Sequence, residues 1–210
     1  MQAPAGLLSL SEHPVRPAYL PGGGVEQDPE ELLASVVGAG RAAVSGAGVP
    51  IDVVTVANQG ETVLAWAPDT GRPLSNMIVW QDRRAEGICA EPAEHKGTLA
   101  QRSGLVLDPY FSAPKMAWLR RNVTRDGVVG TSDSWLIHQL TREFVTDATT
   151  AGRSLLTDLD TTGWDHDLLG LFGLDDERLP TIVPCDAIVG TTTIVATHRP
   201  APRRQARVPG

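Results

Sequence analysis

Apolar residues recur at helical spacing early in the chain, directly after a strong helix-start pattern. The segment Asp28-Pro29-Glu30-Glu31 combines a capping Asp, a Pro at the first helical position and acids in the first turn. Four apolar residues then follow at helical spacing: Leu32, Leu33, Val36 and Val37. Gly38 and Gly40 weaken the helix beyond that point, and Gly46 and Gly48 mark its latest plausible end. Residues 1–24, rich in Pro, Gly and Ser, predict a loop or edge segment before this helix.

Three short runs between residues 51 and 80 have the apolar, β-branched character of strands. Residues 51–57 predict a buried strand, residues 61–66 a second, and residues 77–80 a third after a turn at 69–73. The link between the second and third runs is so short that these two strands must be antiparallel. We therefore expect a mixed sheet.

The pattern becomes mainly helical after residue 83. Helices are predicted at residues 83–90, 97–103, 113–122, 131–140 and 164–171. Ser112 is expected to cap the third of these, and Thr131 or Asp133 the fourth. Strand-like pieces at 143–146 and 153–157 separate the last two helices. The sequence therefore predicts an α/β domain with a helical insertion.

Composition excludes several classes of function. The 210 residues carry a net charge of −7, which argues against a nucleic-acid binder or a membrane-surface protein. No apolar run is long enough for a membrane span, and the N-terminus lacks the order of a signal peptide. The distant Cys89 and Cys185 predict two reduced thiols in a cytoplasmic protein. The five histidines show no ligand spacing, so we expect no metal site from them.

A dense polar cluster follows the third predicted strand. The run Ile78-Val79-Trp80-Gln81-Asp82-Arg83-Arg84 ends an apolar strand in a tryptophan and paired charges, where turn residues are usual. From the residues alone, Trp80 is either a core residue or an aromatic face for a ligand. Asp82 and Arg83 either line a ligand site or, with Arg84, form a surface ion-pair cluster.

Two further positions have side chains suited to holding hydroxyl groups. Glu61 lies just beyond the predicted strand 51–57, where α/β sheets commonly place ligands, and Gln59 would share its face on an extended chain. A solvated turn glutamate is the alternative for Glu61. Tyr110 follows Pro109 in an extended or turn segment, where its hydroxyl either binds a ligand or the ring simply packs. Lys115 either faces the same cleft or is a solvated helix lysine.

In order and spacing, these segments resemble the N-terminal domain of the FGGY carbohydrate kinases, most closely the glycerol kinases. The resemblance covers roughly residues 10–192. Its motifs are Asn58-Gln59-Gly60-Glu61, the run from Ile78 to Arg84, Asp108-Pro109-Tyr110-Phe111-Ser112, and Thr146-Asp147-Ala148-Thr149-Thr150-Ala151-Gly152-Arg153-Ser154. It implies an actin-like, ribonuclease-H-type α/β domain with a mixed sheet and a helical insertion. It also implies transfer of the γ-phosphate of ATP, with Mg²⁺, to a hydroxyl of a small polyol or sugar.

The resemblance also implies roles for individual residues. Glu61 would hydrogen-bond the substrate hydroxyls, Trp80 would pack against the substrate carbons, and Tyr110 would contact the substrate. Gln59, Asp82 and Arg83 would line the same side of the cleft. Glycerol kinases read Asn-Gln-Arg-Glu where this chain has Gly60 in place of the arginine. That change removes a donor and indicates another polyol or sugar, or a site that no longer works.

Several parts that such a kinase uses are not found in this sequence. The family's Asp-x-Gly-Thr-Thr hairpin is absent, and the triple glycine at 22–24 lacks the following Lys-Ser or Lys-Thr of a phosphate loop. A Gly-Asp-Gln segment with the general base is expected shortly after residue 200 but does not occur, nor does the second, adenine-binding domain. We therefore expect an incomplete domain that is inactive alone and binds neither ATP nor Mg²⁺. Its exposed sheet edge would favour aggregation or pairing, so a homo-oligomer is possible.

These observations give one leading interpretation and two alternatives. Residues 1–196 form the substrate-binding domain of a carbohydrate kinase, lacking its first strands, and the basic, Pro-rich residues 197–210 form a disordered tail. One alternative is a non-catalytic polyol-binding, sugar-binding or regulatory protein that keeps the cleft but not phosphotransfer. The other is a non-functional remnant that does not fold stably.

Overall fold

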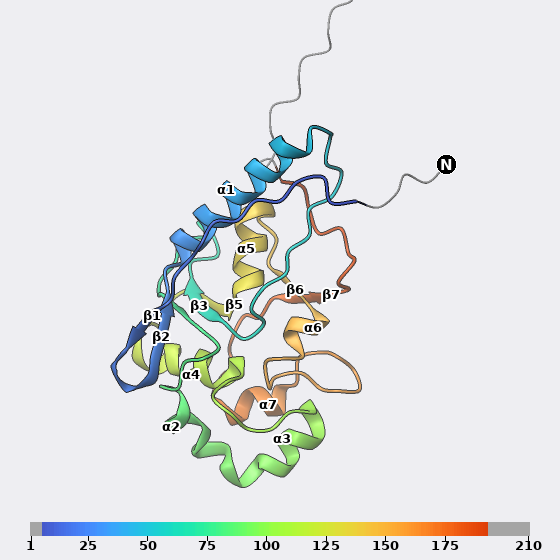
Figure 1. Cartoon of the computed structure of the whole chain (residues 1–210). Coiled ribbons are helices and arrows are strands. Elements are labelled where there is room, and N and C mark those ends of the chain that lie inside the picture. Colours follow the sequence, from blue (N-terminus) through green and yellow to red (C-terminus); the bar gives the residue numbers. More distant parts are fainter. Residues whose placement is uncertain (1–5, 193–210) are drawn as a thin grey trace, which may run out of the picture.

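Helices cover both faces of a five-stranded sheet in the computed structural model, which describes residues 6–192 (Figure 1). In spatial order its strands are β1 (Ala18–Leu20), β2 (Gly24–Gln27), β4 (Met77–Ile78), β3 (Val63–Trp66) and β5 (Val128–Thr131). A separate parallel pair joins β6 (Val145–Asp147) to β7 (Thr181–Val183). The expected antiparallel pairing of the second and third predicted strands is confirmed by the pairing of β3 with β4.

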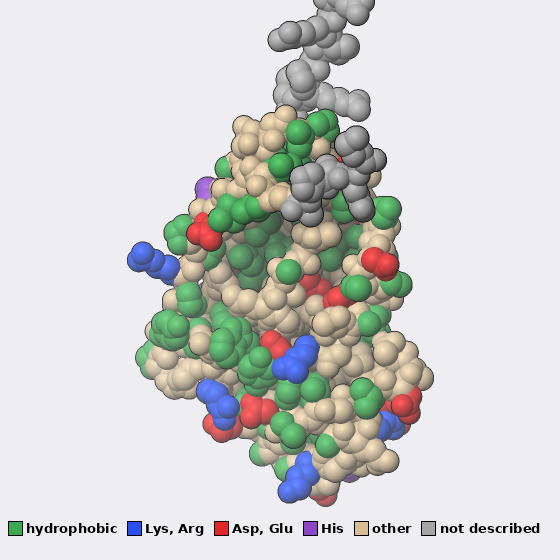
Figure 2. Space-filling model, turned by 45° about the vertical axis from the view of Figure 1, so that its right-hand side comes forward, with side chains coloured by type: hydrophobic (Ala, Val, Ile, Leu, Met, Phe, Trp, Pro, Cys, Tyr) green, Lys and Arg blue, Asp and Glu red, His purple; other side chains and the backbone are tan. Residues whose placement is uncertain are grey.

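Two strand predictions need correction. Every pair in the five-stranded sheet is antiparallel, so within the described residues the sheet itself is not mixed; the parallel pair is separate. Residues 51–57 form no strand, and Ile51, Val53 and Val54 are exposed. A β-branched run becomes a strand only where it finds a partner strand and a surface to pack on, and in the described part of the chain this run has no partner strand. Hydrophobic side chains accordingly reach the surface of the molecule, as Figure 2 shows.

The first predicted helix is confirmed as α1 (Pro29–Ala47). The side chain of Asp28 accepts a hydrogen bond of 2.8 Å from the backbone N–H of Glu30, as a capping residue should. The helix runs past its internal glycines and ends at Gly48, whose φ of 66° is the left-handed conformation typical of a glycine cap. The side chain of His13 lies against Gly38, where an added Cβ would be 2.9 Å from the imidazole. The N-terminal segment therefore runs alongside α1 (Figure 1).

The alternation of side chains along β3 divides the core into two layers. Val63 and Ala65 pack with α4 (Ser112–Asn122) on one face of the sheet. Leu64 and Trp66 pack with α5 (Ser132–Thr141) and, partly, with α1 on the other. Because successive strand residues point to opposite faces, all four are fully buried. The sheet is therefore the middle layer of three.

Of the remaining helices, α2 (Glu86–Cys89), α3 (Lys96–Ser103) and α7 (His166–Leu171) lie at predicted positions with shorter bounds at several ends, whereas α6 (Ala148–Ala151) was not predicted. The chain also forms the 3₁₀ turns η1 (Pro21–Gly23) and η2 (Glu91–His95). The capping prediction for α4 was wrong, and the one for α5 is right in position only, because Thr131 is the residue before the helix. Ser112 lies inside α4 with its buried hydroxyl unpartnered, and the side chain of Thr131 makes no capping bond. Residues 153–157 are a turn with a single bridge from Thr157 to Trp164.

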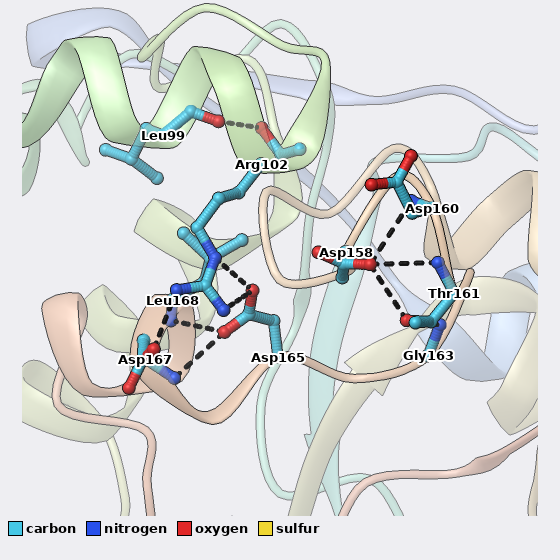
Figure 3. Close-up of polar contacts among 10 residues, drawn as sticks. Leu99, Arg102, Asp158, Asp160, Thr161, Gly163, Asp165, Asp167 and Leu168 are labelled. Atoms are coloured by element: carbon cyan, nitrogen blue, oxygen red, sulfur yellow. Dashed lines mark hydrogen bonds and ion pairs between the residues drawn. The ribbon is translucent and has the colours of Figure 1, made fainter.

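A polar cluster holds the helical insertion against the C-terminal part of the domain (Figure 3). The side chain of Asp165 caps α7 by accepting from the backbone N–H groups of Asp167 and Leu168. Its other oxygen accepts from Nε of Arg102 in α3 at 2.7 Å, and Arg102 also pairs with Asp167. In the adjoining loop, Asp158 accepts from the backbone N–H of Thr161. The cluster therefore ties α3 to α7.

Three observations bear on the remaining sequence predictions. Cys89 and Cys185 are free thiols, and Cys185 is exposed. Within residues 6–192, no helix has both the length and the apolar character that a membrane crossing requires. The predicted tail at 197–210 lies outside the described residues.

Candidate functional site

A groove of about 530 Å³ opens between the end of β4 and the loop that leads into α4. Its lining residues are Trp80, Gln81, Arg83, Val106, Asp108, Tyr110 and Phe111. Three of the six residues predicted from the sequence, Trp80, Arg83 and Tyr110, therefore meet in one place. They come from two segments that the sequence separates by more than twenty residues, and the fold of β4 against α4 brings these together.

Aromatic rings form the wall of this groove. The rings of Trp80 and Tyr110 meet edge to face with centroids 5.6 Å apart, and those of Tyr110 and Phe111 are 5.3 Å apart. Trp80 keeps 38% of its surface exposed, so it is not a core tryptophan. An exposed indole beside a phenol hydroxyl gives an apolar face with a polar group at its edge. Such a face suits the carbon chain and the hydroxyls of a polyol.

Glu61 lies behind this wall and not in the groove lining. Its side chain is almost fully buried, so it is not a solvated turn residue. Its Oε1 accepts a hydrogen bond of 2.7 Å from Nε of Arg153. The guanidinium of Arg153 lies over the rings of Phe111 and Tyr110, 5.0 Å and 5.5 Å from their centroids. Arg153 therefore connects the buried carboxylate to the aromatic wall.

Gln59 lies apart from these residues. It is exposed, and its Oε1 accepts from the hydroxyl of Thr62 at 2.9 Å. The expectation that Gln59 and Glu61 share a face on an extended chain was wrong, because the chain turns at Gly60, where φ is 32°. Within the described residues, no contact joins Gln59 to the groove.

Asp82 is fully buried and works as an anchor between strands. Its Oδ2 accepts from the backbone N–H of Val25 at 2.6 Å and from Nε of Arg84 at 2.8 Å. Arg84 in turn pairs with Glu26 at 2.7 Å, so the network joins β2 to the segment after β4. Asp82 and Arg84 are therefore not a surface ion-pair cluster.

Arg83 is the member of that polar run whose side chain lines the groove. It is half-exposed and pairs with Glu86 at 2.9 Å and with Asp108 at 3.5 Å. Both partners lie at the surface, so these pairs hold the guanidinium only loosely. Arg83 is therefore free to turn toward a ligand.

The position of the Lys115 side chain differs from both positions expected from the sequence. The side chain is fully buried and neither faces solvent nor lines the groove. Its Nζ donates to the backbone carbonyls of three consecutive residues, Pro109 at 3.0 Å, Phe111 at 2.6 Å, and Tyr110 between them. Burial lowers the pKa of Lys115 to about 7, and the carboxylates of Glu61, Asp82 and Asp108 oppose that shift. The lysine therefore holds the loop that carries Tyr110.

The sequence analysis missed the roles of Arg153 and Lys115. Arg153 stands in a motif that carried the family resemblance, and that motif was its available signal. Its partner Glu61 lies 92 positions earlier, and no local pattern indicates such a pairing. Lys115 occupies an apolar helix face, where a lysine is expected to reach solvent. Its three carbonyl acceptors depend on the path of the preceding loop and cannot be read from spacing.

The glycine turn at 22–24 joins two antiparallel strands and is not a phosphate loop. A Cβ at Gly24 would lie 2.8 Å from Nη2 of Arg84. The side chain of Arg84 therefore packs against the end of this turn. Within residues 6–192, no group of three or more His, Cys, Asp or Glu side chains is placed to hold a metal ion.

Curated glycerol kinases are similar in sequence to this chain. The chain is 41% identical over 200 residues to a glycerol kinase of Cereibacter sphaeroides, covering 89% of this chain and 41% of that protein. It is 42% identical over 195 residues to the glycerol kinase of Thermus brockianus, covering 86% and 39%. The chain therefore spans about two-fifths of the length of these curated relatives.

Solved structures agree with the sequence matches. The crystal structure of Plasmodium falciparum glycerol kinase with ADP matches with a TM-score of 0.75 and 31% identity, over 80% of this chain and 37% of that one. Xylulose kinase from Rhodospirillum rubrum matches in fold with a TM-score of 0.84 at 20% identity, over 92% and 42%. The expected actin-like, ribonuclease-H-type fold is thereby confirmed. Residues 9–200 match the N-terminal domain of the FGGY family of carbohydrate kinases, and the chain belongs to that family.

Proposed function

We propose that this chain is the substrate-binding part of an ATP-dependent kinase that phosphorylates a hydroxyl of a small polyol or sugar. The observation that carries the proposal is the meeting of Trp80 and Tyr110 at a groove backed by the buried Glu61–Arg153 pair. Membership of the FGGY family supports it, because the matched relatives are named as carbohydrate kinases. On this proposal, residues 1–196 are the substrate-binding domain.

The side chains suit the binding task in separate ways. The rings of Trp80 and Tyr110 would hold the carbon chain of a polyol, and the Tyr110 hydroxyl would bond to one oxygen. Arg83, at the groove, would donate to another. Holding a substrate hydroxyl in a fixed position is a large part of phosphoryl-transfer catalysis, because it removes the entropic cost of alignment. Asp82 and Gln59 would act indirectly, through the packing of the strand end and the turn.

The reaction needs two things that we do not assign to residues 6–192. A base must remove the proton of the attacking hydroxyl, and cations must neutralise charge on the transferring phosphoryl group. We therefore propose that phosphorylation belongs to a complete FGGY kinase, with ATP and Mg²⁺, and that this chain supplies the binding of the acceptor.

Isothermal titration calorimetry of the full chain with glycerol, xylitol and xylulose tests the proposal. We expect heat of binding for at least one of the three. A Glu61→Gln variant that folds normally should bind that ligand more weakly. If none of the three compounds binds at millimolar concentration, the proposed function is wrong.

A non-catalytic polyol-binding role is the second candidate. The glycine turn at 22–24 favours it, because this turn joins two antiparallel strands and is packed against Arg84, unlike a phosphate loop. The two candidates differ in a coupled assay for ADP release. Polyol-dependent ADP release by the chain would favour the kinase over the binding role and contradict our expectation that it is inactive alone. Polyol binding with no ADP release leaves the binding role in place for the isolated chain.

A further inference from the structure

We propose that Arg153 is the hydrogen-bond donor that, paired with the acceptor Glu61, selects a substrate carrying two neighbouring hydroxyl groups. This inference rests on the proposed polyol-binding function and adds a specificity-determining residue to the site. Its basis is the position of one guanidinium between a buried carboxylate and two aromatic rings.

The contacts of Arg153 leave donors available. Nε donates to Oε1 of Glu61 at 2.7 Å, and the guanidinium plane lies over the rings of Phe111 and Tyr110. The side chain keeps 41% of its surface exposed, and among its hydrogen bonds to other side chains the one of defined length, 2.7 Å, uses Nε and not the terminal amino groups. The hydrogen bond to Glu61 raises the pKa of Arg153, so the group remains a cation throughout the useful pH range.

Glu61 has a free acceptor in the same place. Its Oε1 is taken by Arg153, while Oε2 makes no hydrogen bond within the described residues. A carboxylate oxygen that accepts and a guanidinium amino group that donates, side by side, match the two hydroxyls of a vicinal diol. One hydroxyl would donate to Glu61, and its neighbour would accept from Arg153.

Because Gly60 supplies no donor beside Glu61, a donor for this part of the site must come from another segment. A Cβ at Gly60 would meet nothing nearer than Cγ of Arg153, at 3.9 Å. The stem of Arg153 therefore passes next to the position that a longer side chain at 60 would occupy. The donor for this part of the site comes from a segment 92 residues further along the chain.

Deoxy analogues of glycerol separate a direct contact from a structural role. Binding of glycerol, propane-1,2-diol and propane-1,3-diol is measured by calorimetry for the full-length wild type, Arg153→Met and Arg153→Gln. Arg125→Met is the matched control for lost charge, because Arg125 is exposed and away from the groove. We expect Arg153→Met to weaken glycerol binding about 10-fold or more, the usual effect of losing a hydrogen bond from a charged donor.

The test compares how much each substitution weakens binding of glycerol and of the two propanediols. At least one analogue lacks the hydroxyl that Arg153 serves, and for that analogue we expect the wild type and Arg153→Met to bind alike. Arg153→Gln, which keeps a donor and serves if Arg153→Met does not fold, should retain part of the preference for glycerol. Arg125→Met should bind as the wild type does.

Three results would overturn the inference. The first is an equal loss for all three ligands, which would mean that Arg153 only supports Glu61 or Tyr110. The second is unchanged glycerol binding in both Arg153 variants. The third is a wild type that binds no glycerol; if it still binds xylitol or xylulose, the proposed function survives and only this inference falls. If it binds none of them, both fall.

Discussion

The indole ring of Trp80 meets the phenol ring of Tyr110 edge to face, with centroids 5.6 Å apart and planes at 67°. This contact joins the segment after β4 to the loop before α4, and it sets where the Tyr110 hydroxyl lies. Removing that hydroxyl alone should leave the ring contact in place. Tyr110→Phe should therefore fold as the wild type does and bind glycerol about three- to tenfold more weakly, the usual effect of one lost hydrogen bond.

Tyr19→Phe is the matched control for this prediction. Tyr19 is largely exposed on the edge strand β1 and does not line the groove. The substitution removes the same hydroxyl oxygen as Tyr110→Phe does. Calorimetry on the two variants side by side decides the matter. Equal glycerol affinity in both variants would show that the Tyr110 ring packs in the wall without bonding to the ligand.

Lys115 allows a prediction about stability. Lys115→Met removes the donor from three buried backbone carbonyls, which should lower the free energy of unfolding by about 1–3 kcal/mol. Lys96→Met is the matched control, because Lys96 is exposed at the start of α3. Urea unfolding of both variants gives the comparison. An unchanged midpoint for Lys115→Met would contradict the role assigned to this lysine.

The pH dependence of the same measurement has a definite sign. The pKa of Lys115 is about 7 in the folded chain, below the ordinary lysine value of about 10.4. The unfolded state therefore binds more protons between these values, and the free energy of unfolding rises with pH across this window. From pH 7 to pH 9, the free energy of unfolding of the wild type should therefore rise relative to that of Lys115→Met by up to about 1.4 kcal/mol per pH unit. A difference between the two that stays constant with pH would show that Lys115 titrates normally.

Residues at strand ends and turns show how much of the site the sequence could predict. Trp80 stood out because an apolar strand that ends in a tryptophan and paired charges is unusual, but the residues alone left the roles of Trp80 and Tyr110 open, and the family resemblance implied that both contact a ligand. Both do line the groove. Arg153 could not be found in this way, because its pairing with Glu61 depends on how two distant segments meet in the folded chain.

The fold shows the same limit. Asp28 capped α1 as predicted, because capping depends on a few adjacent residues. Residues 51–57 have strand-like composition but stay unpaired, since a strand depends on a neighbour that composition does not reveal. Asp82 illustrates the point for charge. Its run of polar residues was interpreted as ligand-facing or solvated, yet its carboxylate is buried against Val25 and Arg84.

The effects of an Asp82 substitution on unfolding and on glycerol binding distinguish a structural role from a direct ligand contact. Asp82→Asn replaces one carboxylate oxygen with a donor that faces the N–H of Val25 and the guanidinium of Arg84. Breaking a buried charge pair in this way should lower the free energy of unfolding by about 3 kcal/mol. Asp52→Asn, at an exposed position, is the control. Below the unfolding transition, glycerol affinity should stay within twofold of the wild type. A stable variant with much weaker binding would instead make Asp82 a direct ligand contact.

The two aspartates beside Arg102 should differ in their effect on stability, although both pair with the same side chain. Asp165 is buried and caps α7, whereas Asp167 is exposed and contacts Arg102 only at the surface (Figure 3). Asp165→Ala should lower the free energy of unfolding by about 1–2 kcal/mol through the lost cap alone, and further through the unpaired Arg102. Asp167→Ala should have a much smaller effect, because exposed ion pairs contribute little. Thermal unfolding of the two variants, each with the same charge change, provides the measurement. Equal shifts in Tm would mean that neither burial nor capping distinguishes the two carboxylates, and that α3 and α7 are held together by apolar packing instead.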